Sequence, residues 1–199
     1  MYRRLRSPYR IAAGMAVVAL VRSAAAAPAI WTGPAISFSK PSGANHTLPA
    51  NQDHLTANVA LTRGNTQGII NIFQEASFTS TSPAGTQWAT TLNNPGDSIA
   101  ATNWAALDFT TWTAAYTGNI SANILNYNAV VHLVSDDVYL DLRFTGFQGG
   151  GSGGAFAYTR STPVPEPAGI VLALLGSSGF GLCARRPRRV MGGRDSDSI

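Results

Sequence analysis

The sequence predicts an all-β fold: one antiparallel sandwich or jelly-roll-like domain, flanked by an N-terminal signal helix and a C-terminal transmembrane helix. Three observations predict the β-domain. Apolar residues in the middle of the chain alternate with period two, which is typical of strands with one buried face. Turn-forming clusters at 40–43, 82–85 and 93–97 interrupt this pattern at short intervals. Finally, residues 129–144 have the pattern of a β-hairpin.

The strand candidates before the hairpin are short. We expect strands at 35–39, 68–74 and 87–91. A longer strand is expected at 54–63, with four apolar residues sharing one face: Leu55, Ala57, Val59 and Leu61. The stretch 101–116 fits either one bent strand or a short helix.

The hairpin at 129–144 is the best-determined piece. A two-residue turn at Asp136 and Asp137 would place every apolar residue of one face opposite another, and a four-residue loop is expected to keep this register. The apolar pairs would be Leu133 with Leu140, Val131 with Leu142, and Ala129 with Phe144. On the other face His132 would pair with Asp141. Each good pair contributes roughly 0.2–1 kcal/mol, so several together specify the pairing.

The glycine-rich run at 149–154 has the composition of a flexible linker. Because residues 155–160 after it again resemble a strand, we expect a mobile loop inside the domain and a last strand behind it. The β-rich domain is therefore predicted over 27–160, with a tether at 161–164.

Charge is distributed unevenly along the chain. The net charge is +4, but five arginines lie before residue 23 and five lie after residue 184. Between Pro28 and Pro163, four basic and seven acidic residues leave a net charge of −3. This balance argues against a nucleic-acid partner, because phosphate backbones are bound by clustered positive charge. The middle also contains no cysteine, which excludes disulfides and thiolate metal sites there.

The N-terminal end has the three parts of a signal peptide, predicted over residues 1–26. A basic start is followed by an apolar run of about ten residues and by small residues. Ala24 and Ala26 fit the small-x-small pattern that precedes cleavage, so the cut is expected after Ala26. Export machinery is then the first expected partner.

The C-terminal end has three parts of its own. The tripeptide Pro165-Glu166-Pro167 precedes an apolar run at 170–184, and a cluster of four arginines follows: Arg185, Arg186, Arg188 and Arg189. As a helix the run would be about 22 Å long, which is short for a hydrocarbon core of about 30 Å. The arginines resist translocation and should remain cytoplasmic. An ordinary tail anchor is the alternative interpretation.

This arrangement resembles the PEP-CTERM sorting signal of exported proteins from Gram-negative bacteria, here covering 161–190. The resemblance implies an exosortase partner that cleaves near Pro165–Pro167, a transient membrane stage through the C-terminal helix, and delivery to the cell surface or the extracellular matrix. Here residues 191–199 continue beyond the arginine cluster, whereas the family usually ends there; we expect these nine residues to be a disordered tail. The segment 132–161 also resembles a β-rich module of such proteins, which implies no particular chemistry.

Two candidate sites in the middle have ordinary structural explanations. His132 with Asp141 and Ser135 has the residue types of a catalytic triad, but Ser135 would lie in the turn, too far from His132. No catalytic residue is therefore predicted. Several oxygen-bearing side chains suit Ca²⁺, although their spacing matches no EF-hand loop and such residues also stabilise turns: Asn45, Asn51, Asp53, Asp136 and Asp137. No cofactor is predicted, with Ca²⁺ as the alternative.

Aromatic residues are numerous for so small a body. Exposed rings would suit the sugars of a surface polysaccharide, whereas buried rings would form the core, the favoured interpretation for most of them: Trp31, Trp88, Trp104, Trp112, Tyr116 and Tyr127. The sequence thus predicts an exported, non-enzymatic surface or matrix protein with a structural or adhesive role. A carbohydrate- or calcium-binding module and a secreted hydrolase with an unrecognised site are the alternatives.

Overall fold

The computed structural model describes residues 27–165, and these form a mostly β-sheet domain. The all-β prediction is confirmed at this level. The signal peptide, the apolar run at 170–184 and the arginine cluster lie outside the described residues. Within 27–165, no helix has the length and apolarity needed to cross a membrane.

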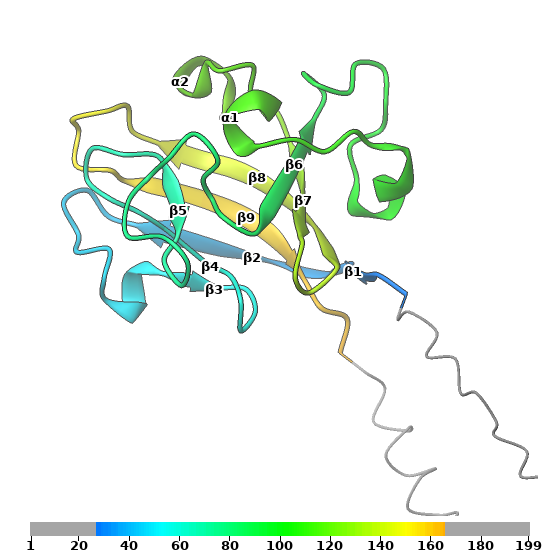
Figure 1. Ribbon diagram of the computed structural model, residues 1–199, viewed down its shortest axis with the longest axis horizontal. Helices are drawn as coiled ribbons and strands as arrows, with labels where there is room; N and C mark the ends of the chain where they lie inside the picture. The colour runs from blue at the N-terminus through cyan, green and yellow to red at the C-terminus, as the bar shows by residue number, and fades with distance from the viewer. Residues whose placement is uncertain (1–26, 166–199) are drawn as a thin grey trace, which may run out of the picture.

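The larger sheet contains most of the strands (Figure 1). Along it the order is β2-β9-β8-β7-β6, with every neighbouring pair antiparallel. β1 joins this sheet by pairing in parallel with the start of β8. The bounds of these strands are β1 Ala29–Trp31, β2 Gly33–Lys40, β6 Thr86–Thr90, β7 Ala129–Leu133, β8 Val138–Phe147 and β9 Phe156–Thr162.

A smaller antiparallel sheet has the order β3-β4-β5, with bounds Asp53–His54, Ala60–Arg63 and Ile69–Asn71.

One buried cluster joins the two sheets: Leu61 and Ile69 of the small sheet belong to the same apolar core as Val131 and Leu140 of the large one. A buried ion pair adds a polar link, because Asp53 of β3 accepts bonds from Arg160 of β9 at 2.7 and 2.9 Å. Tyr158 donates a third bond to the same carboxylate at 2.8 Å.

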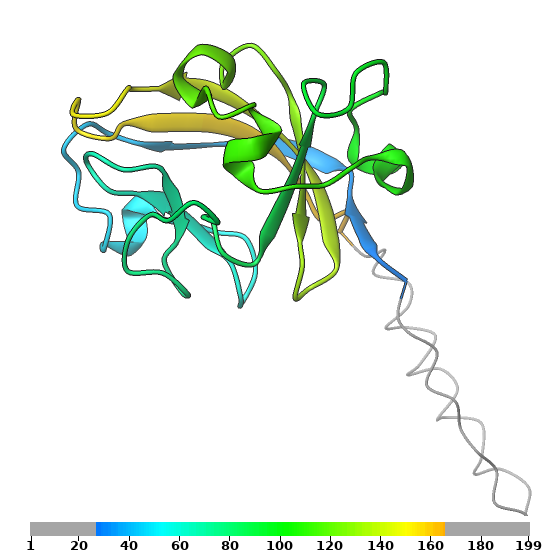
Figure 2. The same ribbon diagram turned by 45° about the horizontal axis from the view of Figure 1, so that its top comes forward.

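Short helices fill the long connection between β6 and β7. The segment 101–116 forms a 3₁₀-helix, η2 (Ala101–Ala106), and then α1 (Trp112–Ala115) rather than a strand; α2 (Ile120–Asn123) follows, and η1 (Pro49–Asn51) precedes β3. Thr111 caps α1, because its side chain accepts a bond from the Ala114 N–H. In Figure 2, α1 and α2 lie on one side of the β6–β7 end, and the 3₁₀ segment lies on the other.

The hairpin of β7 and β8 confirms the predicted apolar face and corrects its register. Leu133 pairs with Val138 and Val131 with Leu140, so each partner is shifted by two residues from the prediction. The connection is a four-residue loop at 134–137, in which Asp137 adopts a φ of 49°. A shift of two residues leaves every side chain on its own face, so the hydrophobic pattern does not distinguish the two registers.

The predicted long strand at 54–63 is wrong, because the chain turns back within it. β3 and β4 form a hairpin in which His54 pairs with Ala60. Thr56 makes the turn: its hydroxyl accepts bonds from the N–H groups of Asn58 and Val59, each at 3.2 Å. Ala57, predicted to face the core, is exposed at this turn.

The glycine-rich segment is an internal loop between β8 and β9, as predicted. Its second half is docked on two neighbouring loops. The Gly43 N–H donates to the Gly153 carbonyl at 2.7 Å, and the Ser42 hydroxyl donates to the Ser152 carbonyl at 3.0 Å. The last strand is β9, which extends to Thr162, so two residues of the predicted tether belong to the domain.

Both ends of the described chain lie at one pole of the molecule (Figure 1). β9 stops pairing with β8 at Arg160, and β1 takes over the same edge of β8 at residues 138–140. Gly33, just after β1, packs against the backbone of Thr162 and Pro163 so closely that a Cβ atom would not fit. We call this end the terminal pole and the opposite end, with the glycine-rich loop, the distal pole.

Candidate functional site

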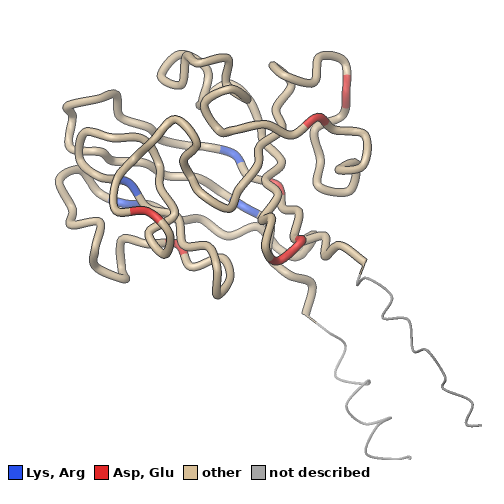
Figure 3. The backbone as a smooth tube through the Cα atoms, viewed as in Figure 1, with Lys and Arg blue, Asp and Glu red and all other residues tan. Residues whose placement is uncertain are grey.

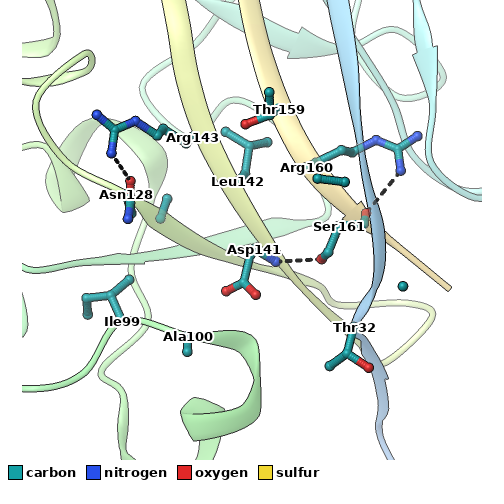
Figure 4. Close-up of a pocket in the computed structure, with 13 residues that line it drawn as sticks. Thr32, Ile99, Ala100, Asn128, Asp141, Leu142, Arg143, Thr159, Arg160 and Ser161 are labelled. Atoms are coloured by element: carbon teal, nitrogen blue, oxygen red, sulfur yellow. Dashed lines mark hydrogen bonds between the residues drawn. The ribbon is translucent and has the colours of Figure 1, made fainter. Parts of the chain in front are cut away.

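A groove of about 420 Å³ lies on the outer face of the large sheet, shown in Figure 4. We call it the outer groove. Strands β8 and β9 form its floor, and the segment before η2 forms one wall. Its polar lining residues are Thr32, Asn128, Asp141, Arg143, Thr159, Arg160 and Ser161.

Asp141 lines the groove together with Arg143. Residues 141 and 143 share one face of β8 because successive side chains of a strand alternate, and Leu142 between them faces the core. One carboxylate oxygen accepts a bond from the Ala101 N–H at 2.7 Å, and the Asp141 N–H donates to the Ser161 hydroxyl at 3.0 Å. Desolvation raises the pKa of Asp141, and the bond from Ala101 works in the opposite direction.

Arg143 supplies the exposed positive charge of the groove, because Arg160 is buried and paired with Asp53. Its side chain is exposed and donates to the Asn128 side-chain oxygen at 3.1 Å. Asp141 and Arg143 make no ion pair with each other, since the ion pairs found within 27–165 are Arg160 with Asp53 and His132 with Asp137. A carboxylate acceptor and a guanidinium donor therefore face one hollow, beside the hydroxyls of Thr32 and Thr159.

The predicted His132–Asp141 pair is wrong. His132 lies opposite Tyr139 and stacks on its ring, with centroids 4.2 Å apart. Its ring nitrogens contact Gln87 at 3.3 Å and Asp137 at 3.1 Å. Asp141 lies opposite Val130 instead, and Ser135 lies in the hairpin loop. The two-residue shift in register thus separates the members of the candidate triad.

The oxygen-bearing residues considered for Ca²⁺ are engaged elsewhere. Asp53 binds Arg160, Asp136 accepts bonds from Thr56 and Asn58 at 2.6 and 2.8 Å, and Asn45 accepts from Thr47. Asn51 donates to the Asn45 carbonyl and Asp137 contacts His132, so each of the five residues has a structural contact. Within the described part of the chain, no three His, Cys, Asp or Glu residues gather around one point.

Most of the aromatic residues are in the core. Trp31, Trp88, Trp112 and Tyr116 are buried, while Trp104 and Tyr127 are partly buried and pack against the apolar clusters. Trp104 stacks on Tyr139 with centroids 4.5 Å apart, which covers the outer face of the β7–β8 hairpin. The core interpretation is therefore confirmed for these rings.

The sorting residues lie at or beyond the edge of the described chain. Pro163, Val164 and Pro165 are exposed and follow directly after β9. Ala24, Ala26, Glu166, Pro167 and the arginines at 185, 186, 188 and 189 lie outside the described residues.

Comparison of the chain with protein-family models, with curated proteins and with solved structures found no match.

Sequence reasoning missed the outer groove as a unit. Asp141 stood out only as a partner for His132, and Ser161 was placed in the tether. No local pattern indicates that the Ala101 N–H would reach Asp141, because this contact spans 40 residues of sequence.

Proposed function

We propose that this chain is an exported, non-catalytic protein of the cell surface or extracellular matrix, sorted by its PEP-CTERM-like tail. The observation that carries the proposal is the terminal pole. Residues 27 and 165, the two ends of the described chain, lie at the same end of the domain, so a membrane-held tail would point the distal pole away from the membrane. In this proposal residues 1–26 are a signal helix cut after Ala26, and residues 170–184 form a short transmembrane helix.

The exposed stretch after β9 supports cleavage near Pro165–Pro167. Residues 163–165 are exposed and belong to no strand, and the prolines keep such a segment extended. A membrane protease would therefore reach the motif without unfolding β9.

The test is the intact mass of the protein recovered from outside the producing cells. We expect a mass that lacks residues 1–26 and the tail beyond the Pro165–Pro167 motif. Replacing Pro165, Glu166 and Pro167 by alanine should leave the chain in the membrane fraction, whereas Pro163→Ala, just outside the motif, should be processed normally. Full-length chain working in the cytosol would overturn the proposal.

The outer groove favours a second function, the binding of a hydroxyl-rich ligand such as a surface polysaccharide. Sugar hydroxyls both donate and accept hydrogen bonds, and the groove offers Asp141 as acceptor, Arg143 as donor and threonine hydroxyls beside them. Binding of a ligand through such hydrogen bonds requires neither a metal ion nor a catalytic residue.

We expect Arg143→Ala to reduce retention of the chain on a polysaccharide array by about tenfold. Thr145→Ala, an exposed residue two positions along the same face of β8, is the matched control and should leave retention unchanged. Retention should also weaken as the pH falls through the raised pKa of Asp141, because protonation removes the carboxylate acceptor. Equal retention of the Arg143→Ala and Thr145→Ala variants would exclude the outer groove as the binding site.

A further inference from the structure

Two buried cations lie side by side near the distal pole without an acidic partner. Lys40 and Arg63 are 1% and 2% exposed, and neither takes part in an ion pair within residues 27–165. Burial lowers the pKa of Lys40, and the positive charge of Arg63 lowers it further. Such an arrangement is unusual, because buried charges are normally paired with an opposite charge.

Neutral backbone carbonyl groups are the only hydrogen-bond partners that these cations have among the described residues. Lys40 Nζ donates to the Gly154 carbonyl at 3.4 Å, and Arg63 Nη1 donates to the next carbonyl, that of Ala155, at 3.1 Å. Arg63 Nε donates to the Gln67 carbonyl at 2.5 Å. Because a guanidinium carries five N–H donors, three donors of Arg63 have no partner in this part of the chain. The positive charge is therefore solvated in part but not neutralised.

An open pocket of about 200 Å³ lies beside Arg63, between the glycine-rich loop, the 64–68 turn and the α1–α2 segment. Aromatic rings form its apolar wall. Arg63 lies over the Phe147 ring at 3.9 Å, and Trp112 meets Phe147 and Phe78 at ring distances of 6.1 and 6.0 Å. Gln67 and Ser121 add polar groups at the rim.

A second, independent observation concerns Trp112 in the wall of this pocket. Trp112 is 1% exposed, and its indole N–H, which is buried, has no acceptor among the described residues. An unsatisfied buried donor costs about 1–3 kcal/mol. Trp112 lines the same pocket as Arg63, so a residue with an unsatisfied donor and an unneutralised cation border one hollow.

We propose that this pocket binds the carboxylate and ring of an acidic sugar, one uronic acid residue of a glycan. The carboxylate neutralises Arg63, and the C–H face of the sugar packs on the aromatic wall. The volume lies below the roughly 300 Å³ at which pockets for drug-sized ligands begin, so it suits one ring. The pocket is separate from the outer groove and does not depend on how the chain is sorted.

The test is a titration of the full chain, purified in mild detergent, with D-glucuronate, D-glucose and acetate, followed by tryptophan fluorescence. We expect glucuronate to bind with a Kd on the order of 1 mM, and glucose and acetate to bind at least about tenfold more weakly, because each offers only half of the recognised chemistry. Equal binding of acetate would show an adventitious ion only and overturn the proposal, as would equal binding of glucose.

Variants at the mouth of the pocket separate the site from folding. Arg63→Gln would also remove bonds to two loop carbonyls, so the informative variant is Ser121→Phe. Ser121 is an exposed rim residue, and the larger side chain should fill the mouth and reduce glucuronate affinity by at least about tenfold. Ala122→Phe, also exposed and next along α2 but outside the pocket lining, should bind like the parent chain. Retained binding in Ser121→Phe, with an unchanged melting temperature, would contradict the proposed site.

Discussion

At the scale of single residues, burial decides what the few charges of this domain do. Of the four basic residues between Pro28 and Pro163, only Arg143 is exposed, and it lines the outer groove. Arg160 is buried and satisfied by Asp53, whereas Lys40 and Arg63 are buried without an acid among the described residues. Figure 3 shows the positions of the basic and acidic residues scattered along the backbone of the domain. The buried Arg160 thus links the two sheets through Asp53, whereas the buried Arg63 keeps a positive charge that the proposed ligand would neutralise.

The Asp53–Arg160 pair should be essential for stability. Asp53→Ala leaves Arg160 buried without its carboxylate and also removes the acceptor of Tyr158, so we expect a loss of about 3–5 kcal/mol in the free energy of unfolding. Urea unfolding of the purified full chain would measure it. Asp97→Ala, an exposed carboxylate, should change this free energy by less than about 0.5 kcal/mol. A loss below about 1 kcal/mol for Asp53→Ala would mean that Arg160 is resolvated at little cost.

At the scale of elements, the glycine-rich loop shows that composition and role differ. Its first glycines lie in open space, whereas a Cβ on Gly154 would overlap the Gly64 carbonyl, at a backbone φ of +66°. The loop therefore has a free half and a docked half. The docked half supplies the carbonyls that meet Lys40 and Arg63, so it is part of the distal pole rather than a spacer.

Two alanine substitutions in this loop should have very different effects. Gly154→Ala places a side chain against the backbone of a neighbouring loop in a left-handed conformation, so we expect it to lower the free energy of unfolding by about 2–4 kcal/mol. Gly149→Ala meets nothing within 4 Å and should change it by less than about 0.5 kcal/mol. Thermal melting of the two variants compares them directly. Similar melting temperatures would indicate that the loop is an undocked linker.

At the scale of the whole molecule, the parallel pairing of β1 with β8 brings the two ends of the domain together. β1 occupies the part of the β8 edge that β9 leaves free, which places the start of the domain beside its end. The terminal pole is therefore a consequence of strand pairing and not of the tails themselves. Both proposed sorting events, the cut after Ala26 and the cut near Pro165, would occur at this pole, leaving the acidic-sugar pocket at the other.

The sequence by itself determined the class of the fold, the apolar face of the β7–β8 hairpin and the separation of a weakly acidic middle from basic ends. These features depend on period-two patterning and on composition, which are local properties of the chain. Only the tertiary structure decided the hairpin register, the turn within 54–63, the ion pair of Asp53 and the two pockets. Their residues are distant in sequence, and a shift of two along a strand leaves the hydrophobic pattern unchanged, so only packing against the rest of the protein selects one arrangement.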